Sequence, residues 1–522
     1  MSMTSDNPRW NNLGYWCHDA AQAYSDRVAI IDLAPEKPRE VRYGELEDRL
    51  DRVASLLRRS GLKPADRVAM SVSNRFEFVE IFFGAMRAGI VPVPLNTKLG
   101  PETLDYIMRD AECVGAVVED LANLHVARIV EALGYRIRLL LDGSRPGWQN
   151  YERALLAASG GFEPQRLADE HPAFQPYTSG STGRPKGVVL THVGQCWWIR
   201  CLQKYWPGQP DSRALAAVPL YHKNAMAGSI KPMLSWGGSV VLLPNFEPRR
   251  FLKTLSEYRC TNISAVPAVF TLLLQERDLI ETLDFSALKS FKIGSAPTPK
   301  ELMDAVELAF GVPASESYGL TEGGPVMIGP PIDGRVVPHG SCGVAWPEGE
   351  VKLVDADGNE HPSYGELWVR NPGVTPGYWR LPEVNRQRLR DGWLSTGDIF
   401  SKDQEGFFYF RGRTDDMFNS GGENVYPLEI ENMLLRNSAV AEASVVPVAH
   451  RIKGEVPVAM VVKAKGREIT EEELKQFCLS IGPAYAHPRR IVFVDELPLN
   501  GPGKIDRKIV QRLMNERFGT LG

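Results

Sequence analysis

The stretch Tyr177-Thr-Ser-Gly-Ser-Thr-Gly-Arg-Pro-Lys-Gly-Val-Val-Leu-Thr-His192 combines hydroxyl side chains, glycines and a lysine, and then becomes apolar. Glycines at 180, 183 and 187 allow tight turns that bring backbone N–H groups close to a ligand. Together with the hydroxyls and the charge of Lys186, they suit a polyanion such as a nucleotide phosphate. The spacing from Gly180 to Lys186 is G-x-x-G-x-x-K, which is neither a Walker A loop nor a nucleophile elbow. On its own, the stretch predicts either a phosphate-binding loop or a linker that leads into buried structure.

Length and composition indicate an ordinary globular protein with more than one domain. A chain of 522 residues is too long for a single hydrophobic core. The net charge of −4 gives no sign of nucleic-acid binding or of a polybasic membrane anchor. The seven cysteines are scattered and form no C-x-x-C pair, as is typical of reduced thiols. Because the polar N-terminus also lacks the apolar core of a signal peptide, we expect a cytoplasmic protein without stable membrane insertion.

Strands and helices are expected to alternate along the first half of the chain. Leu46, Leu50 and Val53 recur at helical spacing and predict an amphipathic helix over 45–59. A strand at 68–72, a helix at 76–88 and a strand at 91–95 follow. This alternation predicts an α/β fold with a largely parallel sheet. Segments 214–220, 262–268 and 291–297 indicate further strands that end in turns, and open sheets bind ligands beyond such strand ends.

The second half of the chain contains short motifs with polar or charged residues. Glu316-Ser-Tyr-Gly-Leu-Thr-Glu322 could cap a helix, but its carboxylate is also the hard-oxygen ligand that Mg²⁺ prefers. Asp391-Gly-Trp-Leu-Ser-Thr-Gly-Asp398 ends in a carboxylate suited to ribose hydroxyls, although an Asp after Gly is also common in turns. Charged residues, then Gly421-Gly422 and a helix start near Pro427, predict a domain boundary. The remaining residues alternate compactly enough for a small α+β domain.

Taken together and in this order, the motifs resemble those of the adenylate-forming superfamily, which contains the acyl-CoA synthetases, the peptide-synthetase adenylation domains and the beetle luciferases. The matching segments are YTSGSTGRPKG at 177–187, YGLTE at 318–322, STGD at 395–398 and PLNGPGKIDR at 498–507. The resemblance runs from about residue 26 to residue 507, and aryl- and fatty-acid–CoA ligases are the members that the chain is most similar to. It implies a large N-terminal domain of parallel-type sheets and helices, and a small, mobile C-terminal α+β domain.

The resemblance also implies roles in nucleotide binding. The phosphate-binding loop would comprise Thr178, Ser179, Gly180, Ser181, Thr182, Gly183 and Lys186. A turn bordering both adenine and the acyl group would comprise Gly294, Ser295, Ala296 and Pro297. Tyr318 would stack on adenine, Thr321 would meet the α-phosphate and Glu322 would hold Mg²⁺. Ser317 and Gly319 would lie beside them, and Asp398 and Arg413 would bind the ribose.

A second set of implied roles concerns the acid, CoA and a moving domain. The acyl pocket and the path of the thiol would be lined by Tyr221, His222, Asn224, Met226 and Gly294. Lys504 would be the catalytic lysine, acting with His222, Thr321 and Glu322. The domains would be 1–412 and 417–522, joined by a hinge at 413–416 that contains Asp415. After a rotation, Gly421 and Gly422 would face the pantetheine tunnel.

We therefore expect an ATP- and Mg²⁺-dependent ligase that makes an acyl-CoA through an acyl-adenylate, with an aromatic or medium-chain acid as substrate and CoA as cosubstrate. The sequence leaves open whether Lys223 contacts the substrate, whether the acid carries a second carboxylate and whether the protein is a homodimer. Transfer of the acyl group to an amine or a carrier protein is one alternative, and it would not depend on CoA. A nucleotide-binding protein with a decayed site would bind ATP without releasing pyrophosphate. A serine hydrolase using a loop serine and His222 would need no nucleotide.

Overall fold

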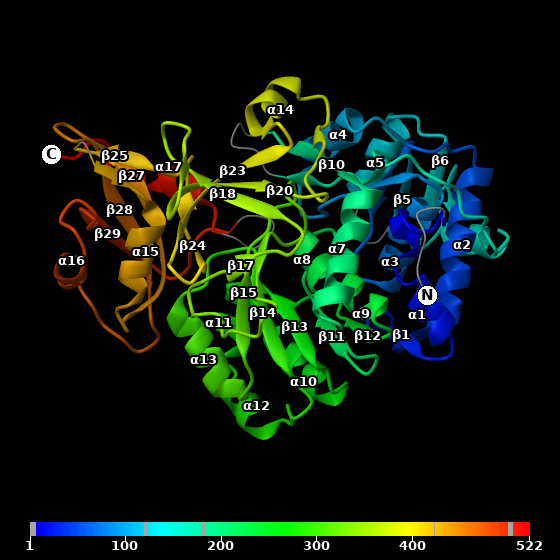
Figure 1. Ribbon diagram of the computed structural model, residues 1–522, viewed down its shortest axis with the longest axis horizontal. Helices are drawn as coiled ribbons and strands as arrows, with labels where there is room; N and C mark the ends of the chain where they lie inside the picture. Colours follow the sequence, from blue (N-terminus) through cyan, green and yellow to red (C-terminus); the bar gives the residue numbers. More distant parts are fainter. Residues whose placement is uncertain (1–6, 120–123, 179–183, 422, 500–504) are drawn as a thin grey trace.

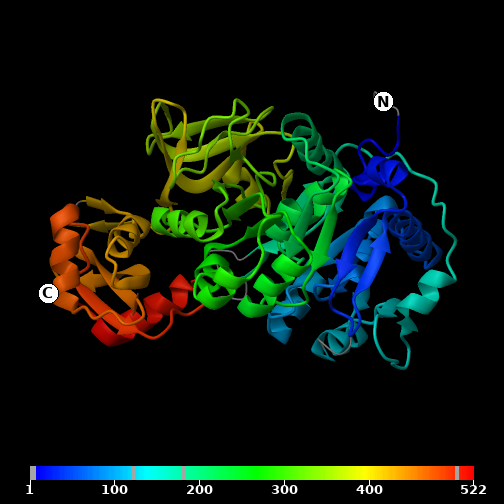
Figure 2. The same cartoon turned by 90° about the horizontal axis from the view of Figure 1, so that it is seen from below.

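The structure, a computed structural model, describes residues 7–119, 124–178, 184–421, 423–499 and 505–522. Figure 1 shows the N-terminal elements in blue at one end of the molecule and the C-terminal elements in orange and red at the other. Figure 2 shows the same order from below. The fold is mixed α/β with a large N-terminal part and a smaller C-terminal part, as the sequence predicts. No helix in the described part of the chain is long and apolar enough to cross a bilayer.

The first sheet is parallel and has the order β4-β3-β5-β6-β7. Its strands are β3 (Arg67–Ser71), β4 (Val91–Pro94), β5 (Cys113–Val118), β6 (Ile137–Leu140) and β7 (Gln149–Asn150). The helices that accompany them are α2 (Tyr43–Arg59), α3 (Phe76–Arg87), α4 (Pro101–Asp110), α5 (Leu124–Ala132) and α6 (Tyr151–Leu156). The helices predicted at 45–59 and 76–88 and the strands predicted at 68–72 and 91–95 are confirmed to within two residues. Leu46, Leu50 and Val53 are buried, as their helical spacing requires.

The second sheet has the order β15-β14-β13-β11-β12-β1-β2, and its neighbours are parallel except for β1 and β2. Its strands are β1 (Val28–Asp32), β2 (Arg39–Arg42), β11 (Arg213–Ala216), β12 (Ser239–Leu242), β13 (Asn262–Ala265), β14 (Ser290–Gly294) and β15 (Ala314–Ser317). The strand predicted at 214–220 ends earlier, at Ala216, and Pro219 beyond it has no N–H to donate to a neighbouring strand.

The two faces of this sheet are covered by different helices. Phe291 and Ile293 belong to a buried apolar cluster with side chains of α10 (Pro248–Glu257), α11 (Pro267–Leu273), α12 (Arg277–Thr282) and α13 (Lys300–Phe310). Ala214 and Ala216 point to the other face, where they pack with Ile230. The elements on that side are α8 (Lys223–Ala225), η2 (Met226–Ile230) and α9 (Lys231–Ser235).

A small antiparallel sheet holds the two ends of the glycine-rich stretch. Its strands are β8 (Pro172–Phe174), β9 (Tyr177–Thr178), β10 (Lys186–Thr191) and β21 (Gly377–Tyr378), and α7 (His192–Tyr205) follows β10. Lys186 pairs with Thr178 and Gly187 with Tyr177, so the stretch connects two paired strands. Val188 and Leu190 are buried, which confirms the predicted entry into buried structure.

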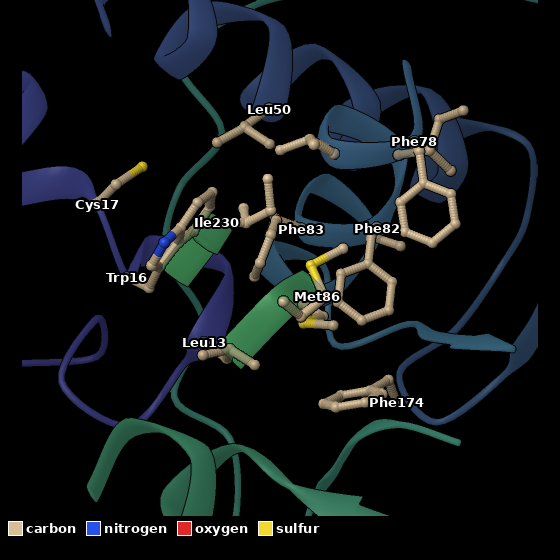
Figure 3. Close-up of a cluster of buried hydrophobic side chains, with 14 of the residues drawn as sticks. Leu13, Trp16, Cys17, Leu50, Phe78, Phe82, Phe83, Met86, Phe174 and Ile230 are labelled. Carbon is tan, nitrogen blue, oxygen red and sulfur yellow. The ribbon is translucent and has the colours of Figure 1, made fainter. Parts of the chain in front are cut away.

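The core beneath this small sheet is rich in aromatic side chains. Figure 3 shows Phe174 of β8 beside Phe82 of α3, and the two ring centroids are 5.0 Å apart. Trp16, between η1 (Leu13–Tyr15) and α1 (His18–Ala23), stacks on Phe83. The strands that flank the loop therefore rest on one continuous apolar cluster.

An antiparallel sheet follows, with the order β19-β18-β20-β23-β22 and with β24 paired to β23. Its strands are β18 (Glu350–Val354), β19 (Glu360–His361), β20 (Tyr364–Arg370), β22 (Leu389–Arg390), β23 (Trp393–Lys402) and β24 (Phe408–Arg413). The short helix α14 (Pro382–Arg388) precedes β22, and β16 (Ile328–Gly329) pairs with β17 (Val344–Ala345) nearby. The sequence did not predict this antiparallel arrangement.

The C-terminal part combines a mixed sheet with helices, which agrees with the expected α+β composition. Its elements are β25 (Phe418–Ser420), β26 (Glu423–Val425), α15 (Pro427–Leu435), β27 (Val440–His450), β28 (Gly454–Lys463), α16 (Glu471–Ile481), β29 (Arg490–Val494) and α17 (Arg507–Phe518). A turn at 414–416 joins β24 to β25. Arg507 Nη2 donates to Glu431 Oε2 (2.6 Å), and Arg507 Nε lies 3.8 Å from Asp416 Oδ2 in the turn. One guanidinium thus links α17 to α15 and to the connection between the two parts.

Candidate functional site

Glu322 lies against the base of the glycine-rich stretch. Its Oε1 accepts a hydrogen bond from the Tyr378 hydroxyl (3.1 Å) and a longer one from Thr178 Oγ1 (3.5 Å). Its backbone carbonyl accepts from Thr375 N (2.7 Å). Because Tyr378 is on β21 and β21 pairs with β10, the carboxylate is held beside both strands that flank the stretch. Lys186 Nζ lies 5.8 Å from the Tyr378 ring centroid and brings a positive charge to the same place.

Asp398 forms a second polar centre where β15, β23 and β24 meet. The Tyr318 hydroxyl donates to Asp398 Oδ2 (2.5 Å), and Arg413 Nη1 lies 3.5 Å from Asp398 Oδ1. The register of β23 and β24 places Asp398 opposite Arg413. Asp398 is only 3% exposed, and burial raises the pKa of its carboxyl while Arg413 opposes that rise. Asp398 Oδ1 accepts no hydrogen bond from the described residues, so it is an acceptor open to a ligand hydroxyl.

The turn after β14 is joined to α8 by polar contacts. Asn224 Nδ2 donates to Ser295 Oγ (3.1 Å), and Ser264 Oγ of β13 donates to Asn224 Oδ1 (3.1 Å). Ser295 has a φ of +69°, a left-handed backbone conformation that residues other than glycine adopt rarely. Gly294 is buried at the end of β14, and Ala296 and Pro297 follow it in the turn. The predicted acyl residues Asn224, Gly294 and Ser295 are therefore brought together.

Tyr221 and His222 lie just before α8 with their ring centroids 4.7 Å apart. Burial raises the pKa of Tyr221 to about 12, and its hydroxyl has no hydrogen-bond partner within the described residues. Lys223 points towards Gly319, since a Cβ at that glycine would lie 2.9 Å from Lys223 Nζ. Met226, which was predicted to line the acyl pocket, is only 4% exposed and packs into the large apolar cluster. Little of its side chain is therefore accessible to a ligand.

The other predicted site residues fall into two groups. Ser317 ends β15, Tyr318 and Gly319 follow it, and Thr321 lies in the loop that leads to Glu322. Asp415 is exposed in the turn at 414–416, and Gly421 has a left-handed φ of +65°. The expectations for Ser179, Gly180, Ser181, Thr182, Gly183, Gly422 and Lys504 concern positions outside the described residues.

Sequence reasoning missed three residues that the fold brings to these centres. Tyr378 binds Glu322, Ser264 binds Asn224, and Arg388 Nη2 of α14 donates to the carbonyl of Thr396 (2.6 Å), two residues before Asp398. In the sequence, each of these three residues lies outside the short motif that contains its hydrogen-bond partner. A single sequence contains no periodicity or spacing that would identify such partners.

The chain is similar to known proteins along most of its length. A sequence model of the family described as "AMP-binding enzyme" matches residues 17–379, and one described as "AMP-binding enzyme C-terminal domain" matches residues 429–504. A feruloyl-CoA synthase from an Amycolatopsis species is 34% identical over 491 residues, which cover 91% of this chain and 94% of the relative. A 2-succinylbenzoate–CoA ligase from Bacillus cereus is 32% identical over 507 residues, covering 96% and 98%. The crystal structure of ATP-bound MatB from Rhodopseudomonas palustris superposes with a TM-score of 0.88 at 31% identity, covering 97% of this chain and 99% of that one.

Proposed function

The chain belongs to the AMP-binding enzyme family, and from this premise we propose that it is an ATP-dependent acid–CoA ligase that activates an aromatic carboxylic acid. The observation that carries the proposal is the position of Glu322, whose carboxylate meets Thr178 and Tyr378 at the base of the glycine-rich stretch. The names of the relatives support an aromatic acid, because feruloyl and 2-succinylbenzoate groups are both aromatic.

The chemistry requires two steps in one site. In the first, an oxygen of the acid attacks the α-phosphorus of ATP, a P–O bond to pyrophosphate breaks, and an acyl-adenylate forms. In the second, the sulfur of CoA attacks the acyl carbon, the C–O bond to AMP breaks, and the thiol proton leaves. The first step brings a carboxylate onto a polyanion, so positive charge and hydrogen-bond donors must surround the phosphates. Lys186 and Thr178, together with the expected donors at 179–183 and Lys504, would supply them.

The nucleoside fits the polar centre at Asp398. Its buried Oδ1 accepts no hydrogen bond from the described residues and could accept one from a ribose hydroxyl. The Tyr318 hydroxyl donates to the other carboxylate oxygen, and the charge of Arg413 favours the ionised form of the carboxyl against the effect of burial. Gly294, Ser295, Ala296 and Pro297 would border adenine and the acyl group, with Ser317, Gly319 and Thr321 on the next strand end.

Glu322 is the residue that would hold Mg²⁺. Within the described ranges, no group of three or more His, Cys, Asp or Glu side chains is arranged to hold a metal ion. In nucleotide sites Mg²⁺ is usually bound through one or two carboxylates together with the phosphates of the substrate. When bound there, Mg²⁺ would supply positive charge beside the phosphate oxygens.

We propose that the two steps use two positions of the C-terminal domain. The domains would be 1–412 and 417–522, with the hinge at 413–416 including Asp415. In one position Lys504 would face the α-phosphate, and in the other Gly421 and Gly422 would face the CoA thiol beside His222. A short exposed turn is suited to such a pivot, because few packed side chains resist a change in its backbone angles.

The experiment that tests the function measures pyrophosphate release from ATP and Mg²⁺ with aromatic, fatty and dicarboxylic acids, each with and without CoA. We expect release that depends on an aromatic acid, with CoA converted to a thioester. Acid-dependent release without consumption of CoA would mean that the acyl group goes to another acceptor. An absence of release with every acid would overturn the proposal.

A further inference from the structure

Lys292 lies in the middle of β14, and its side chain points away from the apolar cluster. Its neighbours Phe291 and Ile293 are both buried against the helices on one face of the sheet. Side chains alternate along a strand, so Lys292 is directed to the opposite face. There it is in register with Ser264 of β13 and Ser315 of β15.

This opposite face is the side on which the acyl residues lie. Ser264 donates to Asn224, which in turn donates to Ser295. Gly228 of η2 is packed against Ser264, since a Cβ at Gly228 would lie 2.2 Å from Ser264 Oγ. Lys292 is next to Ser264 in the register and two residues before Gly294. Its side chain therefore leaves the strand on the same face as Ser264, close in sequence to the turn at 294–297.

Lys292 lacks a counter-ion within the part of the chain that the structure describes. Among the described residues, no carboxylate forms an ion pair with it and no side chain or carbonyl accepts a hydrogen bond from its Nζ. The Lys292 side chain is partly buried, and this burial lowers the pKa of its ammonium group. Lys231, which is fully buried, differs because its Nζ donates a hydrogen bond to Gln195 Oε1 (2.6 Å). An anionic group on a ligand would supply Lys292 with a counter-ion.

A second cation points towards the ends of the same strands. Lys223 begins α8, and its Nζ lies against Gly319 just after β15, the neighbour of β14 in the sheet. Asn224, the next residue, bonds to both Ser264 and Ser295. Two lysines from different elements thus border the region where the acyl group would lie.

Resting on the proposed ligase activity, we propose that the aromatic acid carries a second carboxylate and that Lys292, with Lys223, binds it. The first carboxylate would react with ATP near Glu322, while the second would pair with the lysines on the wall formed by Asn224, Ser264 and Ser295. An acid without the second carboxylate would leave Lys292 unpaired in the complex. The bound acid would shield the partly buried ammonium group from water without supplying a counter-ion, and such a complex is disfavoured. Lys292 is therefore a specificity residue.

The test compares matched pairs of acids that differ only in the second carboxylate: cinnamate against 4-carboxycinnamate, and benzoate against 2-, 3- and 4-carboxybenzoate. Pyrophosphate release gives kcat/KM for each acid with the wild-type protein and with Lys292→Met. Methionine has a similar length and no charge, so the variant should fold, and its thermal midpoint is measured to check this. Lys289→Met is the matched control, because Lys289 lies just before β14 and pairs with Asp211 (3.9 Å) at the surface.

We expect the wild type to prefer the dicarboxylate of at least one pair. Lys292→Met should then lose about thirtyfold or more in kcat/KM for that dicarboxylate, the usual effect of truncating one partner of a buried charge pair, with the matched monoacid changed far less. Lys289→Met should resemble the wild type with both acids. A wild type that prefers the monoacid in every pair, or a Lys292→Met variant that affects both acids of a pair equally, would overturn this inference and leave the ligase activity intact. Absence of release with every acid would instead overturn the proposed function.

Discussion

Replacing Tyr378 by phenylalanine removes the hydroxyl that holds the carboxylate of Glu322. A hydrogen bond to a charged group contributes about 1.5 to 3 kcal/mol. The Tyr378 hydroxyl lies 3.1 Å from Glu322 Oε1, longer than the usual O–H···O distance of about 2.7 to 2.8 Å, so the lower figure applies. At about 1.4 kcal/mol per factor of ten, the expected loss is about tenfold. Thr178, at 3.5 Å, is too distant to replace the missing donor.

The loss should appear in kcat/KM for acid-dependent pyrophosphate release and as a higher Mg²⁺ concentration for half-maximal rate. A change that only disturbed the fold would not raise the Mg²⁺ concentration for half-maximal rate. That measurement therefore distinguishes a role in positioning Glu322 from a structural role. Tyr205→Phe is the control, because the Tyr205 hydroxyl also donates to a glutamate, Glu348 (3.0 Å), but at the exposed surface. If Tyr378→Phe keeps the wild-type kcat/KM and Mg²⁺ dependence, Tyr378 does not position Glu322 for the reaction.

Three further predictions follow from the site and its surroundings. Lys504→Ala should reduce acyl-adenylate formation by orders of magnitude while ATP binding, measured by calorimetry, changes little, and equal activity of variant and wild type would exclude the proposed role. Gly319→Ala should lower the thermal midpoint and the rate of acid activation, because its Cβ would lie 2.3 Å from the carbonyl oxygen of Pro325 and overpacking typically costs about 1 to 3 kcal/mol; an unchanged midpoint would show that the backbone relaxes freely. Burial raises the pKa of Glu316 from 4.5 to about 8, so the folded protein holds a proton that the unfolded chain has lost, and this contribution to stability declines as the pH rises from about 5 to about 8. Glu316→Gln stays neutral throughout, so its thermal midpoint should fall less over that range than that of the wild type, and an equal fall in both would contradict the raised pKa.

Elements with a strong local pattern were predictable from the sequence. The apolar spacing in α2, the proline that begins α15 and the apolar runs of β3 and β4 each depend on a few neighbouring residues. The antiparallel sheet of β18, β20 and β23 was not predicted, because its stability comes from pairing between strands that are far apart in the chain. The end of β11 was also placed too late, since the apolar run continues past the last paired residue.

The residues of the candidate site also divide into those that a local motif identifies and those that only the folded chain brings together. The motifs that contain Glu322, Asp398 and Arg413 can be found from the sequence because each is short and ordered along the chain. The contacts that Glu322 and Asp398 make with Tyr378 and Tyr318 could not be found in this way. The Tyr378 contact depends on the pairing of β21 with β10, and the Tyr318 hydroxyl reaches Asp398 only because the second sheet abuts β23. Lys292 was missed because a lysine between two apolar residues is typical of an exposed strand, and a single sequence does not reveal that η2 packs against Ser264, the register neighbour of Lys292 on that face.

The guanidinium of Arg507 limits where the chain can pivot between its two parts. It bonds Glu431 and the carbonyl of Val445, both beyond the turn, and also lies 3.8 Å from Asp416 within it. A rotation about the backbone of residues 414 and 415 carries Asp416 along with Arg507 and leaves all three contacts intact. A rotation about any later bond would separate Arg507 from Asp416. The axis of such a motion should therefore pass on the N-terminal side of Asp416, and α17, which Arg507 begins, would turn together with Asp416 as one rigid unit.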